Sequence, residues 1–155
     1  MNILDFLVPG SVALRFTAHD SKEVITHLGN LLFDAGYVRD SFVDAALDRE
    51  SRLPTGLPLS GDVNAAIPHT EVEHVLKPGL AMATLTTPVN FQNMVMPEEA
   101  VPCRLVFVMA LDQPKAQVEM LQEIAGILQD QVVIEQLMSA SSFEDVRSVF
   151  SKERS

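Results

Sequence analysis

The sequence predicts a layered α/β domain in which helices cover a central sheet. Apolar stretches of strand length are interspersed with segments whose apolar residues recur at the helical spacing of three and four. Their order is one strand, two helices, three strands and three helices, which is typical of α/β layers. Hydrophobic residues make up 47% of the 155 residues, enough for a sizeable core. We therefore expect a single domain over residues 1–155.

The chain begins with a predicted strand over 11–16 and an amphipathic helix over 20–36. Asp20 and Glu23 have the spacing of a capping box, and Gly36 is suited to ending the helix.

A second helix starts at Asp40 or Ser41 and runs to about Arg52, and its apolar face places Arg49 at the edge of the buried stripe. Residues 53–62 contain two prolines and two glycines, and we expect them to form a loop.

Three strands and three helices follow. The strands are predicted over 63–67, 79–87 and 103–111. The segment 88–102 holds three prolines and is expected to be a loop. Apolar spacing and N-terminal capping residues predict helices over 114–129, 131–140 and 142–152.

Composition excludes several classes of function. The 11 lysines and arginines are scattered in a chain of net charge −10, so we expect no nucleic-acid partner. No apolar run approaches the roughly 18 residues of a membrane span, so we expect no direct membrane insertion. The N-terminus lacks the basic region of a secretory signal. The lone Cys103 cannot form an internal disulfide, which fits a reducing compartment, most simply the cytoplasm; we interpret it as a structural residue of a buried strand.

His69 directly follows Pro68, where the strand 63–67 is predicted to end. Proline favours an extended residue before it and fixes its own φ, so the chain leaves the sheet here. Ligand sites in α/β sheets gather beyond strand ends, which makes His69 a candidate functional residue. The alternative is a histidine that only caps the strand by bonding a nearby carbonyl.

Three features favour the functional interpretation. Arg49 can make two bonds to one phosphoryl group. Gly56, which follows Thr55, lets the backbone approach a ligand closely or bend tightly. Gln117 lies in the first turn of a helix, whose N-terminus stabilises a nearby phosphate. The chain contains no Walker A, G-x-G-x-x-G, C-x-x-C or G-x-S-x-G motif.

The stretch HTEVEH raises the question of a metal, although it is not H-E-x-x-H. On a helix, His69 and His74 would diverge by about 140°. A loop site made by these histidines and Glu71 is an alternative, but we expect no metal and no cofactor.

LDRESRLPTG followed by AAIPHTE resembles the IIA component of the bacterial phosphoenolpyruvate-dependent sugar phosphotransferase system, in its mannitol/fructose class (EIIA type 2). An R-E pair, a T-G pair and a P-H pair occur there in that order. The resemblance covers nearly the whole chain and implies a three-layer α/β/α sandwich with a central mixed sheet. It implies that His69 receives a phosphoryl group on Nε2 from the phosphocarrier protein HPr and passes it to a cysteine of the IIB component. The membrane-embedded IIC component then moves the sugar. Arg49 and Thr55 match supporting residues of the family.

One departure from the mannitol and fructose members is informative. Their second active-site histidine corresponds here to Gln117, and the galactitol-type branch is similar in that glutamine and in a histidine at the position of His74. The chain is therefore closest to galactitol-type IIA proteins. His74 either takes over part of the missing task or is an ordinary surface residue. A regulatory IIA-like protein that signals its phosphorylation state without sugar transport is the alternative function, and an unrelated α/β binding module with a structural His69 is the third.

Two partners must use one face in turn, so we expect a small, transient interface. The candidate docking residues are Leu53, Leu57, Leu59 and Val89; the alternative for each is ordinary packing in the core or in a loop.

Overall fold

A computed structural model describes residues 2–153, so residues 1, 154 and 155 of the expected domain lie outside the described part. Within it the chain forms a mixed five-stranded sheet of order β1-β4-β5-β3-β2. β4 pairs in parallel with β1 and antiparallel with β5, and β3 pairs in parallel with β5 and antiparallel with β2. The strands are β1 Leu7–Phe16, β2 Gly56–Leu57, β3 Asn64–Ala66, β4 Gly79–Gln92 and β5 Ala100–Ala110.

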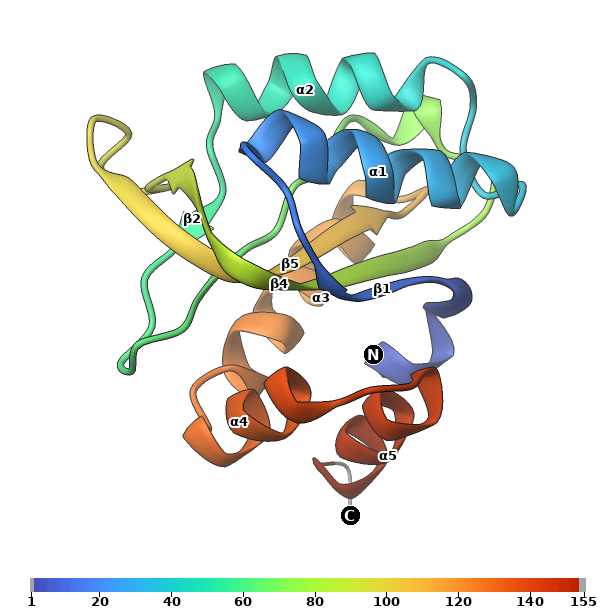
Figure 1. Cartoon of the computed structure of the whole chain (residues 1–155). Coiled ribbons are helices and arrows are strands. Elements are labelled where there is room, and N and C mark those ends of the chain that lie inside the picture. Colours follow the sequence, from blue (N-terminus) through green and yellow to red (C-terminus); the bar gives the residue numbers. More distant parts are fainter. Residues whose placement is uncertain (1, 154–155) are drawn as a thin grey trace.

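Helices cover both faces of this sheet, which confirms the predicted three-layer arrangement (Figure 1). One face carries α1 Ser21–Asp34 and α2 Phe42–Arg52, and the other carries α3 Pro114–Ile127, α4 Gln131–Ser139 and α5 Phe143–Glu153. Two short 3-10 turns, η1 Ile3–Asp5 and η2 Val72–His74, complete the elements. No helix among residues 2–153 is long and apolar enough to span a membrane.

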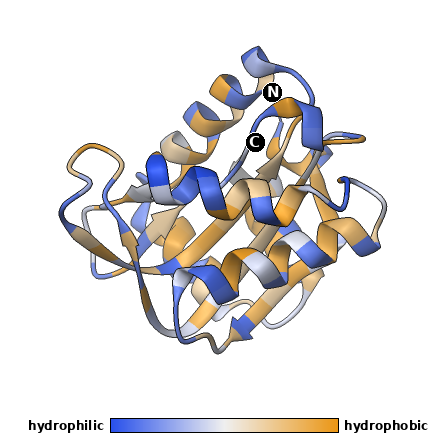
Figure 2. Cartoon of the chain, turned by 90° about the horizontal axis from the view of Figure 1, so that it is seen from above, coloured by the Kyte–Doolittle hydropathy of each residue, from blue (hydrophilic) through white to orange (hydrophobic). Residues whose placement is uncertain are grey.

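Alternate residues of β5 serve two separate cores. Phe107 and Met109 pack toward the face of α3, α4 and α5, whereas Val106 and Val108 pack toward α1 and α2. Because a strand flanked by helices on both sides has no solvent face, its sequence reads as an unbroken apolar run. Figure 2 shows this as hydrophobic colour on the central strands, beneath helices that carry both colours.

The N-cap predicted at Asp20 and the helix end predicted at Gly36 are confirmed, whereas the Glu23 side chain bonds the N–H of His19 and not, as a full capping box requires, that of Asp20. The Asp20 carboxylate accepts a hydrogen bond from the Glu23 N–H at 2.9 Å, and the Glu23 carboxylate accepts from the His19 N–H at 3.3 Å. Gly36 has a φ of +84°, and the N–H of Gly36 and of Tyr37 turn back to bond the last carbonyls of the helix. This is a Schellman ending, which favours glycine because the left-handed conformation disfavours a Cβ.

The expected loops at 53–62 and 88–102 are only partly loops. β4 continues to Gln92 and β5 begins at Ala100, so the two form a long hairpin. The register of this pair shifts between Thr84 and Val89, and that irregular stretch accommodates Pro88 without a ladder hydrogen bond. β2 lies within 53–62, and its two residues are too few to show any periodic pattern.

Candidate functional site

His69 lies where the chain leaves the sheet after β3. The Pro68 carbonyl accepts a hydrogen bond from the Met109 N–H of β5 at 3.0 Å, so the chain is still anchored one residue before His69. The ring of His69 is half-buried, and its Nδ1 lies 3.0 Å from the carbonyl oxygen of Ile67. A carbonyl can only accept, so Nδ1 carries the proton and Nε2 keeps a free lone pair.

The surroundings of His69 keep this ring neutral. Burial lowers the pKa of His69 below its ordinary value of 6.5, and the positive charge of Arg49 lowers it further. The bond to the Ile67 carbonyl and the negative charge of Glu71 act in the opposite direction without reversing the shift. A neutral ring with an unprotonated Nε2 is the form of histidine that can act as a nucleophile.

Arg49, near the end of α2, is paired with Glu71 in the loop after His69. Its Nη1 donates to Glu71 Oε2 at 2.6 Å, and this bond lowers the pKa of the Glu71 carboxyl. A guanidinium has five N–H donors, and its buried Nε has no acceptor among residues 2–153. Arg49 therefore holds the His69 loop through Glu71 and keeps donors for an anion. From the sequence, Glu71 was a candidate only for a metal site.

Thr55 supports the site from beneath. Its N–H and its hydroxyl both donate to the Glu50 carboxylate, each at 2.8 Å, and the hydroxyl oxygen accepts from the Ile67 N–H at 3.1 Å. Thr55 is only 4% exposed, so its hydroxyl faces the strand end that carries His69.

Glu50 received no role from the sequence beyond its place in the R-E pair. Successive residues of a helix point about 100° apart, so Arg49 and Glu50 leave α2 in different directions, Arg49 to Glu71 and Glu50 to Thr55. Burial raises the pKa of the Glu50 carboxyl, and its bonds with Thr55 oppose this shift. The available signal was an acid near the end of α2, five residues before Thr55.

Gln117 also reaches the His69 loop. Its Nε2 donates to the carbonyl of Thr70 at 2.7 Å, which ties the first turn of α3 to the residue after His69. The structure thus gathers four of the sequence-predicted site residues around one strand end: His69, Arg49, Thr55 and Gln117.

His74 lies apart from that group. Its Nδ1 is 2.8 Å from the Ser41 hydroxyl at the start of α2, and Ser41 makes no side-chain cap bond within the helix. Arg49 follows Ser41 by eight residues, or about 12 Å of helix. The position of His74 favours the surface interpretation over a direct part in the chemistry.

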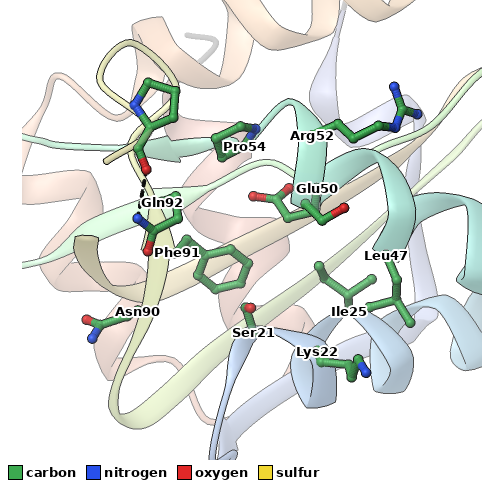
Figure 3. Close-up of a pocket in the computed structure, with 12 residues that line it drawn as sticks. Ser21, Lys22, Ile25, Leu47, Glu50, Arg52, Pro54, Asn90, Phe91 and Gln92 are labelled. Carbon is green, nitrogen blue, oxygen red and sulfur yellow. Dashed lines mark hydrogen bonds between the residues drawn. The ribbon is translucent and has the colours of Figure 1, made fainter. Parts of the chain in front are cut away.

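A cavity of about 300 Å³ lies beside Glu50, between α1, the end of α2 and the end of β4 (Figure 3). Its lining includes Lys22, Leu47, Glu50, Arg52, Phe91 and Gln92, and does not include His69. Within residues 2–153, no group of three or more histidine, cysteine or acidic side chains is placed to hold a metal ion.

Two further expectations concern single residues. Val89 is only 3% exposed, so its prediction as a docking residue is wrong: the extension of β4 buries it in the core. Leu53 is 52% exposed, and Leu57 and Leu59 are partly buried. Cys103 is buried within β5, and desolvation by burial raises its pKa to about 12, so its thiol stays protonated.

The chain is similar to a known protein family over nearly its whole length. Residues 5–153 match the family described as phosphoenolpyruvate-dependent sugar phosphotransferase system, EIIA 2. The PTS system galactitol-specific EIIA component of Escherichia coli K12 is 32% identical over 120 residues, which cover 77% of this chain and 79% of that protein.

Two solved structures from Escherichia coli superpose well. The crystal structure of IIA mannitol has a TM-score of 0.76 at 30% identity, covering 93% of this chain and 98% of that one. The complex of enzyme IIAMTL with phosphorylated enzyme IIBMTL has a TM-score of 0.76 at 29% identity, covering 94% and 97%.

Proposed function

This chain belongs to the EIIA type 2 family of the phosphoenolpyruvate-dependent sugar phosphotransferase system and is a phosphotransfer component of it; we propose that His69 is the residue that carries the phosphoryl group. One observation carries the proposal. The Ile67 carbonyl holds the proton of the imidazole at Nδ1, which leaves Nε2 unprotonated on a neutral ring. The group is accepted from HPr and passed to a cysteine of a IIB component.

The chemistry at His69 needs no cofactor. The Nε2 lone pair attacks phosphorus, and a new P–N bond forms as the bond between phosphorus and the donor breaks. Nδ1 keeps its proton throughout and donates it in a hydrogen bond to the Ile67 carbonyl, so the phosphorylated ring remains a good leaving group. An incoming thiolate then forms a P–S bond while the P–N bond breaks, and His69 returns to its starting tautomer.

Phosphoryl transfer depends mainly on positioning and on stabilising charge. Arg49 supplies the positive charge: it can share its donors between Glu71 and the phosphoryl oxygens. The Gln117 amide holds the loop and adds polarity without a charge, and Thr55 fixes the strand end. Arg49 shares its charge with Glu71, so the phosphoryl group is held loosely enough to leave again.

The partners are proteins. The related mannitol IIA protein is known in a complex with phosphorylated IIB, and the partial exposure of His69, beside the exposed Glu71, supports the same use here. Leu53, two residues before Thr55, and Val118, directly after Gln117, are exposed apolar side chains and are the docking residues we propose. Exchange of a phosphoryl group between such partner proteins fits a cytoplasmic location.

The transported sugar is assigned by relationship alone. The galactitol-specific relative, together with Gln117 and His74, supports galactitol or a related polyol. The IIA component never touches the sugar, so no residue described above determines which sugar is transported.

The test is a phosphorylation assay with phosphoenolpyruvate, enzyme I and HPr, followed by mapping of the acid-labile phosphate. We expect one label on His69, no label on His69→Ala, and normal labelling of His19→Ala, a matched control at an exposed histidine. His69→Ala that labels as well as the wild type contradicts the proposal. Addition of a galactitol-type IIB should move the label to its cysteine; a stable label on His69 that no IIB accepts favours the regulatory alternative.

A further inference from the structure

We propose that Glu50 is a positioning residue that sets the tautomer and orientation of the His69 ring, acting through Thr55 and the backbone of Ile67. The proposal rests on His69 being the phosphorylated residue. It assigns this partly buried carboxylate a role in the reaction, although Glu50 does not touch the reacting atoms. Three links connect Glu50 with the ring.

The first link is the pair of hydrogen bonds between Thr55 and the Glu50 carboxylate. Both oxygens of the Glu50 carboxylate are used, one by the N–H and the other by the hydroxyl of Thr55, each at 2.8 Å. Hydrogen bonds to an ionised carboxylate are roughly twice as strong as neutral ones. Glu50 therefore fixes both the backbone and the side chain of Thr55.

The second link depends on the direction of one hydroxyl. Because the Thr55 hydroxyl gives its only proton to Glu50, an oxygen lone pair is left to accept the Ile67 N–H at 3.1 Å. Ile67 lies one residue beyond β3, whose last pairing with β2 is between Ala66 and Gly56. The Thr55 side chain thus replaces the next step of the ladder, and without the carboxylate the hydroxyl is free to turn away.

The third link reaches the ring. The peptide unit before the Ile67 Cα is held through the Ile67 N–H, and the peptide unit after the Pro68 Cα is held through the Pro68 carbonyl, which accepts from Met109. Between these two fixed points the Ile67 carbonyl is directed at Nδ1 of His69, 3.0 Å away. A carbonyl that could swing away would leave the neutral ring free to carry its proton on either nitrogen, and a proton on Nε2 blocks attack on phosphorus.

The energetics argue against a purely structural Glu50. Burial raises the pKa of this carboxyl, so keeping it ionised in the folded protein costs free energy. A neutral side chain would stabilise the loop with a smaller desolvation penalty. Glu50 also lines the cavity shown in Figure 3, which gives a neutral replacement of similar size room to settle.

The experiment compares Glu50→Gln with Asp44→Asn, which removes the same charge from an exposed position of α2. Ring ¹⁵N chemical shifts of the unphosphorylated proteins report the tautomer of His69, and labelling from phospho-HPr reports the rate. The amide introduced by Glu50→Gln can accept from only one of the two Thr55 donors. We expect the Nδ1–H tautomer to lose its dominance and labelling to slow by about tenfold, the effect of one lost hydrogen bond. Asp44→Asn should match the wild type in both.

Thr55 variants test the pathway. Thr55→Val removes the middle link and should shift the tautomer as Glu50→Gln does, whereas Thr55→Ser keeps the hydroxyl and should preserve it. If Glu50 acts through Thr55, the double variant Glu50→Gln/Thr55→Val will be no slower than Thr55→Val alone. Should Glu50→Gln fail to fold, Thr55→Val with its serine control gives the same readout.

The outcomes separate the two proposals. Glu50→Gln and Thr55→Val proteins with lowered melting temperatures but an unchanged His69 tautomer and labelling rate would overturn the positioning role. A wild type that takes no phosphate on His69, while Glu50→Gln still shifts the tautomer, would instead remove the proposed function and leave the positioning of the ring established.

Discussion

His69 and His74 lie five residues apart in one segment, yet the two ends of that segment are built differently. At the first end, His69 is half-buried and bonded through Nδ1 to a backbone carbonyl held by the sheet. At the second, His74 is bonded through the same atom to the Ser41 hydroxyl, on the start of α2. A carbonyl dictates a tautomer, whereas a hydroxyl can donate or accept and dictates none. The partner of the ring, rather than the ring itself, distinguishes the proposed phosphorylation site from a surface contact.

The largest effect is expected at Arg49, because it places a positive charge at the His69 end of the segment and holds that loop through Glu71. Arg49→Ala removes the guanidinium from the transferring phosphoryl group, and we expect labelling of His69 to fall about 100-fold, the cost of a charged hydrogen bond of about 3 kcal/mol. Arg49→Lys keeps the charge without the planar fork and should recover only part of the rate. Labelling kinetics provide the measurement, and a rate within twofold of wild type for Arg49→Ala contradicts this role.

The pH dependence is the next largest effect. Since the pKa of His69 lies below its ordinary 6.5, Nε2 stays unprotonated across the neutral range. Labelling should therefore be constant above pH 6.5 and fall by about tenfold per unit only below the lowered pKa. A rate measured from pH 5 to 8 in constant ionic strength tests this. A rate that already halves at pH 6.5 or above would show that the site leaves the pKa unshifted or raises it.

The pKa shifts of His69 and Glu50 make the free energy of unfolding depend on pH in opposite directions. His69 binds a proton less readily when folded, so its contribution is present above pH 6.5 and is lost as the pH falls through its lowered pKa. Glu50 binds a proton more readily when folded, so its contribution weakens as the pH rises from 4.5 through its raised pKa. The measurement is the free energy of unfolding in urea, determined at several pH values for wild type, His69→Ala and Glu50→Gln. Each variant should lack the pH dependence that the replaced side chain contributes. Parallel plots of this free energy against pH for all three proteins contradict the shifts.

Replacing Gln117 should have a moderate effect on the rate at which His69 is labelled. Gln117→Ala removes the bond from its amide to the Thr70 carbonyl, and we expect labelling to slow by about fivefold, the effect of one neutral hydrogen bond. Gln117→Glu places a negative charge beside the phosphoryl group and should slow it more. If the glutamate variant labels faster than the alanine variant, the uncharged amide is not what the site requires.

The smallest effect on labelling is expected from changes at His74 and Ser41. His74→Ala and Ser41→Ala each break one exposed contact, so labelling should stay within about twofold and the free energy of unfolding should fall by no more than about 1 kcal/mol. Labelling and urea unfolding measure the two quantities. A loss of tenfold or more in labelling for His74→Ala alone would give His74 a direct part in the chemistry.

The elements that the sequence predicted well are those with a periodic or apolar signal. The strands 79–87 and 103–111 and the cap of α1 needed only local residues. The hairpin arms beyond them were hidden, because prolines usually mark loops, whereas Pro88 lies in the irregular stretch of β4 and Pro102 lies within β5. β2 was hidden because two residues carry no period.

The site divides in a similar way. Pro68 before His69, Arg49 at the edge of a helix and Gln117 in a first turn are readable because each depends on local geometry. The partners are not readable from single positions: Glu71 pairs with Arg49 across 22 residues, and Glu50 bonds Thr55 across the end of α2. The direction of the Ile67 carbonyl depends on a hydrogen bond to Thr55, twelve residues away. Such contacts arise only when the layers assemble.

The proposed reaction forms a bond between phosphorus and Nε2 of His69, and NMR coupling between phosphorus and the ring nitrogens detects that bond. The ¹⁵N-histidine-labelled protein is phosphorylated with phosphoenolpyruvate, enzyme I and HPr, and the ³¹P–¹⁵N coupling is assigned to a ring position. The tautomer held by the Ile67 carbonyl predicts a single phosphorus bonded to Nε2 of His69. Phosphorus on Nδ1 of His69, or on any other histidine, would contradict it.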